Sequence, residues 1–129
     1  MTFETLKAMS KDYSVFIKKN HSITEIKLCL EKTLNCSLKE VISQEGIIYS
    51  TKFLGLNISL QDEIDYIDDV IRFSEYGYEI IFDYIRNEFI GYYSNEWREL
   101  VSIIIADILS KKLKSDCIAV RNLHTILSR

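Results

Sequence analysis

The chain of 129 residues has no proline, only four glycines and three cysteines. Nothing in it has the Pro-, Gly- or Ser-rich composition of an interdomain linker. The cysteines, Cys29, Cys36 and Cys117, are odd in number and form no CxxC pair, which predicts free thiols in a reducing compartment. Apolar runs such as residues 103–106 are too short to span a bilayer, and no secretory signal is visible. We therefore expect one cytoplasmic domain over residues 1–129, without membrane association.

The sequence motifs of common enzymes are missing as well. The chain contains no GxSxG, no HExxH and no glycine-rich phosphate loop. Its two histidines have no flanking motif, so we expect His21 in a solvated loop and His124 at the edge of the core. Cys36 has no adjacent base that would activate it as a nucleophile. We therefore expect neither enzymatic activity nor a cofactor.

Hydrophobic periodicity predicts two helices. Ser22 and Glu25 have the spacing of a capping box, and the apolar residues after them recur at helical spacing, which predicts a helix over residues 23–35. A second helix is predicted from Ser94 to about Leu113. Its apolar stripe consists of Trp97, Leu100, Val101, Ile104, Ile105, Ile108 and Leu109.

Alternating patterns predict strands, two of which enclose one acidic segment. Residues 53–60 and 76–84 both alternate with a period of two, which is typical of half-buried strands. The first predicted face contains Leu54, Leu56, Ile58 and Leu60, and the second contains Tyr76, Tyr78, Ile80, Phe82 and Tyr84. Further strands are predicted at 46–53 and 117–120, while the tail at 123–127 fits either strand or helix. These elements predict an α+β fold, with a mostly antiparallel sheet packed against amphipathic helices.

The net charge of −3 hides an uneven distribution. Residues 62–83 carry eight acids against the single base Arg72, a net charge of −7, whereas the flanks 1–61 and 84–129 are each +2. Phosphates would be repelled by this zone, so nucleic acid is not an expected partner. A basic protein surface is the expected partner.

The stretch LQDEIDYIDD at 60–69 is the centre of this acidic zone. Counted from Asp62, a calcium loop would need an oxygen ligand at its third position and a glycine at its sixth, where Ile64 and Ile67 stand. We therefore expect no metal site. A catalytic carboxylate pair would need one desolvated member, and no accompanying nucleophile is present. Two interpretations remain: a solvated loop without a partner, and a docking surface.

Tyrosine within the acidic cluster favours the docking surface. Tyr66 lies among the carboxylates, and protein surfaces combine acids that steer a basic partner with aromatic rings that supply buried contact. The predicted partner-binding residues are Asp62, Glu63, Asp65, Tyr66, Asp68, Asp69, Glu75 and Tyr76.

A family resemblance agrees with this interpretation. The stretch FLGLNISLQDEIDYIDDVIRFSEYGYEIIFDYI at 53–85 resembles bacterial toxin immunity proteins, in particular those of contact-dependent growth inhibition systems. The resemblance lies in the alternating LGLNISL strand, the acidic EIDYIDD connection and the aromatic EYGYEIIF strand. It implies a cytoplasmic protein without catalytic activity that binds and blocks the C-terminal domain of a cognate toxin, often a nuclease.

Two other functions stay open at the level of the sequence. One is a regulatory or scaffolding module that binds a basic protein within its own cell. The other is a hydrolase that uses the carboxylates of the acidic stretch, for which activity would need a divalent ion.

Overall fold

The computed structural model describes residues 12–43, 46–62, 75–84, 94–122 and 125–128. In chain order, its elements are β1 (Tyr13–Lys18), α2 (Ile23–Leu34), β2 (Lys39–Ser43), β3 (Gly46–Phe53), β4 (Leu56–Asp62), β5 (Tyr76–Tyr84), α3 (Ser94–Leu113), β6 (Cys117–Arg121) and β7 (Thr125–Ser128). The described strands form one sheet in the order β2-β3-β4-β5-β1-β6-β7, with every neighbouring pair antiparallel. The prediction of an α+β fold with a mostly antiparallel sheet is confirmed.

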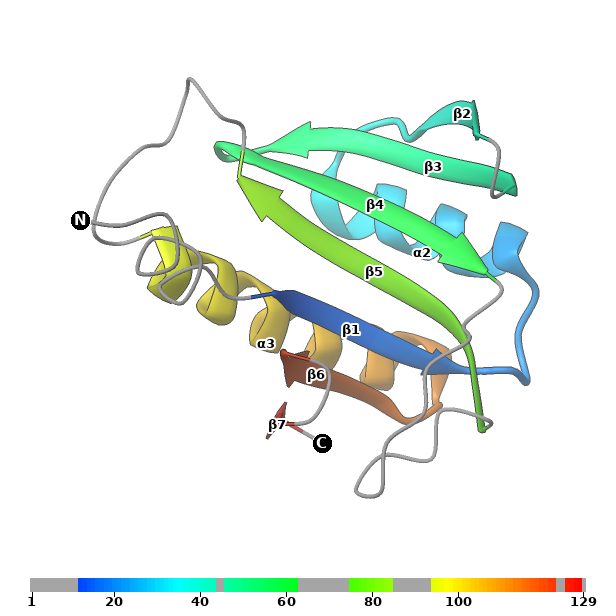
Figure 1. Cartoon of the computed structure of the whole chain (residues 1–129). Coiled ribbons are helices and arrows are strands. Elements are labelled where there is room, and N and C mark those ends of the chain that lie inside the picture. Colours follow the sequence, from blue (N-terminus) through cyan, green and yellow to red (C-terminus); the bar gives the residue numbers. More distant parts are fainter. Residues whose placement is uncertain (1–11, 44–45, 63–74, 85–93, 123–124, 129) are drawn as a thin grey trace.

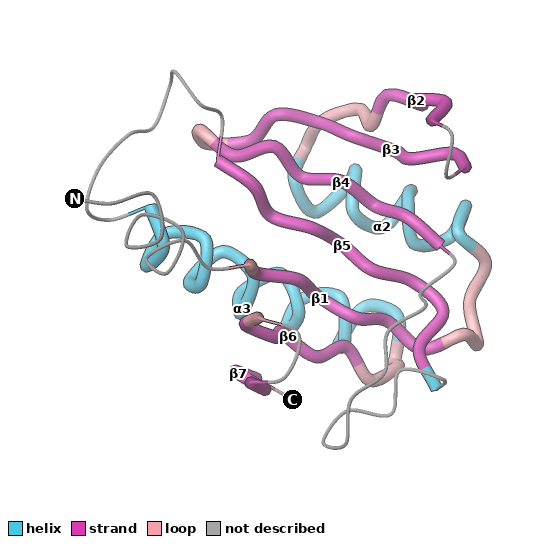
Figure 2. Tube along the Cα trace, viewed as in Figure 1, coloured by secondary structure: helices cyan, strands magenta, loops and turns pink. Residues whose placement is uncertain are grey.

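The first strand of the chain lies in the interior of the sheet. β1 is placed between β5 and β6, and both are antiparallel to it, so β5 and β6 run parallel to each other. Parallel strands need a long crossover, and α3 supplies it between the end of β5 and the start of β6. Both helices lie on the same face of the sheet, with α2 behind β3 and β4 and α3 behind β1 and β6 (Figures 1 and 2).

The core fills the space between the helices and this face of the sheet. Because successive strand side chains point to opposite faces, every second residue of the central strands enters the core. The strands contribute Val15, Ile17, Leu56, Ile58, Leu60, Ile80 and Phe82, and the helices contribute Ile26, Leu30, Leu34, Val101, Ile105, Ala106 and Leu109. All of these side chains are buried.

Both predicted helices are confirmed. The capping box of α2 is present: Glu25 N donates to Ser22 Oγ and Ser22 N donates to Glu25 Oε1, each at 3.2 Å. α2 ends at Leu34 and is capped by Asn35, whose left-handed backbone (φ 52°) lets the N–H of the next residue, Cys36, donate to the Glu31 carbonyl at 3.1 Å. α3 ends at Leu113, as expected.

The strand predicted over residues 53–60 is wrong at its start. The chain turns at Leu54 and Gly55, which both have positive φ (48° and 81°), as a tight hairpin turn requires. Phe53 of β3 pairs with Leu56 of β4 across this turn, and Leu54 is 61% exposed. The alternation predicted a face correctly for the rest of the strand, since Leu56, Ile58 and Leu60 are buried.

The face predicted for Tyr76 is also wrong. The register between β1 and β5 shifts between Ile17 and Lys18, so Lys18 pairs with Tyr76. A bulge of this kind changes which face a side chain occupies. Tyr76 consequently packs with Phe16 in a second apolar cluster, on the face of the sheet without described helices, whereas Tyr78 and Ile80 face the core.

The apolar stripe predicted for α3 is rotated relative to the observed one. Leu100 and Ile104 are 49% and 47% exposed, although both were expected in the stripe. The buried positions include Arg98, Ser102 and Ala106. Polar residues such as Arg98 can occupy buried positions here because they have hydrogen-bond partners within the fold.

Candidate functional site

The acidic segment connects two neighbouring strands at one end of the sheet. β4 ends at Asp62, β5 begins at Tyr76, and Asp62 pairs with Tyr78 across the antiparallel ladder. This confirms that the connection lies at a sheet end, which we call the acidic end. Asp62 and Glu75, the two ends of the connection, are both exposed.

Most of the predicted partner-binding residues belong to the connection itself. Glu63, Asp65, Tyr66, Asp68 and Asp69 lie outside the described residues. Their predicted role therefore depends on their sequence and on the position of the two strand ends that enclose them.

Tyr76 differs from the other predicted contact residues because it is buried. Its side chain is 7% exposed, and its ring meets that of Phe16 edge-on, with centroids 6.3 Å apart and an interplanar angle of 64°. This ring fills the second apolar cluster, so little of it is accessible to a partner. The sequence did not predict the buried position of Tyr76, because the alternation of residues gives no sign of the bulge beside Lys18.

Tyr78 links the acidic end to the start of α2. Its hydroxyl donates a hydrogen bond to the carbonyl oxygen of His21, in the connection between β1 and α2. Burial raises the pKa of the Tyr78 phenol, and the nearby carboxylates of Asp62 and Glu25 raise it further. The phenol therefore stays protonated and acts as a donor.

His21 is half-buried and not solvated, which corrects the sequence prediction. Its side chain is 18% exposed, and Nδ1 lies 3.2 Å from Glu25 Oε2. The hydrogen bond from His21 holds the pKa of Glu25 below its usual value, with further contributions from the backbone and hydroxyl of Ser22. The predicted core-edge histidine, His124, lies outside the described residues.

Basic residues are also present beside the acidic end. Lys18 Nζ lies 3.4 Å from Asp116 Oδ2, and both side chains are substantially exposed. A hollow of about 270 Å³ lies between them and Glu75, lined also by Tyr76 and Ile118. The exposed ion pair contributes little to stability. The described part of this end therefore has charges of both signs, and its acidic excess comes from the connection.

A buried carboxylate on the other face of the sheet was not anticipated. Glu79 was expected on the outer face of its strand, yet it is 1% exposed. Ser14 Oγ donates to its Oε2 at 2.8 Å, and Gln61 Nε2 donates to its Oε1 at 3.0 Å. Burial of a charge requires such partners, so Glu79 is part of the structural network of the sheet. The only sequence signal was a glutamate within a strand.

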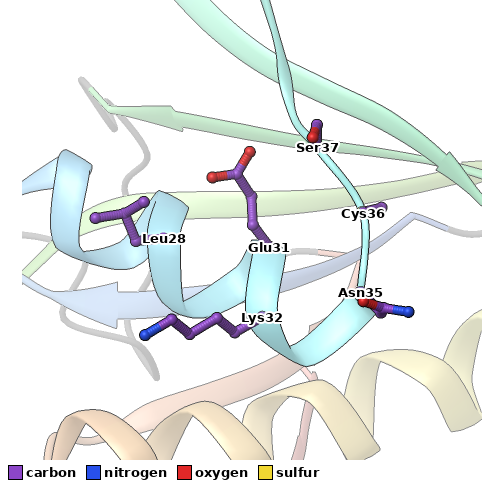
Figure 3. Close-up of a pocket in the computed structure, with 6 residues that line it drawn as sticks. All are labelled: Leu28, Glu31, Lys32, Asn35, Cys36 and Ser37. Carbon is purple, nitrogen blue, oxygen red and sulfur yellow. The ribbon is translucent and has the colours of Figure 1, made fainter.

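A shallow hollow lies where α2 meets the connection to β2 (Figure 3). Its volume is about 400 Å³, and it is lined by Leu28, Glu31, Lys32, Asn35, Cys36 and Ser37. Figure 3 shows the Glu31 carboxylate directed toward Ser37, with Lys32 pointing away from it. Glu31 Oε2 accepts a hydrogen bond from Leu38 N at 2.8 Å. This carboxylate therefore has a structural role, since it fixes the start of β2.

Cys29, Cys36 and Cys117 are all free, as expected. Within the described ranges, no three His, Cys, Asp or Glu side chains gather closely enough to hold a metal ion. Among the helices of the described residues, none is both long and apolar enough to cross a membrane.

Comparison with known proteins gives no match for this chain. No protein-family model, no curated protein and no solved structure is significantly similar to it.

Proposed function

We propose that the chain is an immunity protein that binds and neutralises a cognate bacterial toxin domain through its acidic end. One observation carries the proposal: residues 62–75, with six acids against the single base Arg72 and a net charge of −5, connect two neighbouring strands of the sheet at one sheet end. Its described ends, Asp62 and Glu75, are exposed to solvent. The resemblance of residues 53–85 to immunity proteins of contact-dependent growth inhibition systems supports the toxin as the partner.

The charge distribution suits a nuclease toxin. A nuclease needs a positive cleft to hold the phosphates of its substrate, and an acidic protein surface can occupy that cleft or the surface beside it. Attraction over a distance speeds association, and close pairing of charges and rings then determines which toxin is bound. The protein would act in the cytoplasm, where the toxin meets its substrate, and would need no catalytic group or cofactor.

The experiment is a protection assay with a charge-reversed variant. An immunity gene is expected to lie beside its toxin gene, so the toxin domain encoded there is expressed together with the wild type, with the triple variant Asp65→Lys, Asp68→Lys and Asp69→Lys, or with a control. The control makes the same change in net charge at exposed acids outside the acidic connection: Asp12→Lys, Glu96→Lys and Asp107→Lys. We expect growth with the wild type and the control, and growth arrest with the triple variant.

Two results would contradict the proposal. If the triple Lys variant protected cells and bound the toxin as tightly as the wild type, the acidic connection would not be the contact surface. If the wild type neither bound the toxin nor protected against it, and instead retained a basic protein of its own cell, the chain would be a regulatory or scaffolding module.

A further inference from the structure

The β2–β3 hairpin ends beside the acidic connection. β2 is the last strand of the described sheet, with β3 as its only described neighbour. β2 ends and β3 begins at the acidic end, where β4 also ends and α2 starts (Figures 1 and 2). In the ladder, Ile42 pairs with Ile47, and the next residue of β3, Ile48, pairs with Gln61, which precedes Asp62. Two strand spacings, about 10 Å, therefore separate Ile42 from the start of the acidic connection.

The hairpin exposes aliphatic side chains at this end. Ile42 is 82% exposed, Val41 is 49% exposed and Ile47 is 43% exposed. Edge strands are usually protected by lysine, proline or a bulge, whereas β2 has Val41 and Ile42 at its centre and charges only at Lys39 and Glu40. Ile42 and Ile47 are cross-strand partners on one face of the sheet, whereas Val41 points to the opposite face. An exposed aliphatic pair of this kind on an edge hairpin is typical of an interaction site.

The outer face of α3 provides a contrast. Leu100 and Ile104 are also about half exposed, but they lie between Glu96 and Asp107 on the helix surface, away from the acidic end. Single exposed leucines are common in folded proteins and need no partner. The hairpin differs because Ile42 is far more exposed than either of them, at 82%, and lies about two strand spacings from Asp62, where the acidic connection starts.

We propose that the hairpin end, defined by the cross-strand pair Ile42 and Ile47, is the apolar half of the surface that binds the toxin, with the acidic connection that starts at Asp62 as the charged half. The inference rests on the proposed function. Interfaces combine an apolar centre that provides affinity with charges that steer the partner and fix its orientation. The occupant is a basic protein, because the acidic connection, which starts at Asp62 two strands from Ile42 and has a net charge of −5 over residues 62–75, attracts positive charge. A second copy of this chain, with a net charge of −3, lacks that complementarity.

The apolar half and the charged half of the proposed surface should contribute to affinity with different dependences on salt. Attraction between the acidic connection and a basic partner weakens as salt screens the charges. Burial of Ile42 and Ile47 is not weakened by screening, so its contribution persists at high salt. Replacement of the aliphatics should therefore lower affinity by the same factor at low and high salt, mainly through faster dissociation.

The test uses the purified toxin domain that the proposed function expects to be encoded beside this chain, with its catalytic residue replaced, and the double variant Ile42→Thr/Ile47→Thr. Threonine keeps the strand preference and removes apolar surface. The matched control, Leu100→Gln/Ile104→Gln, removes a similarly exposed aliphatic pair from α3. We expect the hairpin variant to bind about tenfold more weakly at both salt concentrations, which corresponds to about 1.4 kcal/mol. The control should bind like the wild type. The acidic triple variant should lose affinity chiefly at low salt.

The outcomes separate this inference from the proposed function. If the hairpin variant bound like the wild type while the acidic variant did not, the apolar half would be wrong and the proposed function would stand. If the toxin did not bind the wild type, both would fail. If the chain alone sedimented as a dimer that the hairpin variant dissociated, the hairpin would be a self-association surface and the inference would be overturned. Amide hydrogen exchange in residues 39–48 of the wild type must slow in the complex, which tests the contact without any variant.

Discussion

The hydroxyl of Tyr78 donates a hydrogen bond to the carbonyl oxygen of His21, and this contact joins the start of β5 to the connection between β1 and α2. Asp62 pairs with the same tyrosine from the neighbouring strand. Tyr78 therefore joins three of the segments that surround the base of the acidic connection, with its backbone paired to β4 and its side chain bonded to the connection before α2. The proposed surface depends on this arrangement, because it fixes where the connection leaves the sheet.

Replacement of Tyr78 by phenylalanine should destabilise the fold. The variant removes the donor and leaves the His21 carbonyl without this partner, and such a loss costs about 1 kcal/mol. Urea unfolding followed by circular dichroism would measure the change in the free energy of unfolding. Tyr49→Phe is the control, because no hydrogen bond of its hydroxyl is found within the described part of the chain. Equal stability of Tyr78→Phe and the wild type would show that the contact contributes nothing.

Glu25 should make stability depend on pH in the acidic range. Its pKa in the folded protein is lowered from 4.5, first by the hydrogen bond from His21 and then by Ser22. A lowered pKa means that the stabilising contribution is fully present above 4.5 and is lost as the pH falls through the folded value. Glu25→Gln cannot ionise, so the difference in unfolding free energy between wild type and variant should be larger well above 4.5 than well below it. A pH-independent difference would contradict this account.

Leu54 occupies a position where its side chain is unfavourable. Its backbone has a φ of 48°, a left-handed conformation that costs a β-carbon-bearing residue about 1 kcal/mol, and its side chain is 61% exposed. Leu54→Asn should therefore raise the free energy of unfolding by up to about 1 kcal/mol, since Asn-Gly is the preferred pair for this turn. The hydrogen bond from Trp97 Nε1 to the Leu54 carbonyl, 3.0 Å long, involves the backbone and is kept. Thermal unfolding would detect the shift, and a destabilised variant would show that the leucine side chain has a contact role.

The strong periodic signals in the sequence predicted the elements that carry them. The capping box at Ser22 and Glu25, the alternation from Leu56 to Leu60 and the long helix ending at Leu113 are all found. By contrast, β1 and β2 were not predicted. β1 is buried along nearly its whole length, so its sequence YSVFIK does not alternate, and β2 is a short edge strand of five residues. A strand without a period gives no local signal, and its place between β5 and β6 is set by tertiary contacts.

Arg98 shows why the buried face of α3 could not be predicted from hydrophobicity. It is 2% exposed, and its guanidinium lies 5.2 Å from the ring centroid of Tyr13. Nη2 donates to Asn95 Oδ1 at 2.6 Å and Nη1 donates to the Phe82 carbonyl at 3.4 Å. These partners belong to β1, α3 and β5, and they make burial of the charge possible. The charge of the acidic segment, in contrast, follows directly from its composition and can be read from the sequence.

Cys117 should be the least reactive of the three thiols. It is 1% exposed at the start of β6, and burial raises its pKa from 9.0 to about 11, only partly opposed by a hydrogen bond with Ser110. Alkylation requires the thiolate and access of the reagent, and both are limited at this position. With iodoacetamide under native conditions, peptide mapping should show labelling of Cys36, which lines the hollow beside α2, before that of Cys117.

The dependence of the labelling rate on denaturant shows whether Cys117 reacts slowly because it is buried or because its thiol is intrinsically unreactive. β6 is paired with both β1 and β7, so exposure of this thiol requires the sheet to open. Labelling of Cys117 should therefore accelerate with denaturant in parallel with unfolding, while the rate at Cys36 changes much less. If Cys117 were alkylated as fast as Cys36 in the native protein, β6 would open locally, and the interior position of β1 between β5 and β6 would not protect the core from solvent.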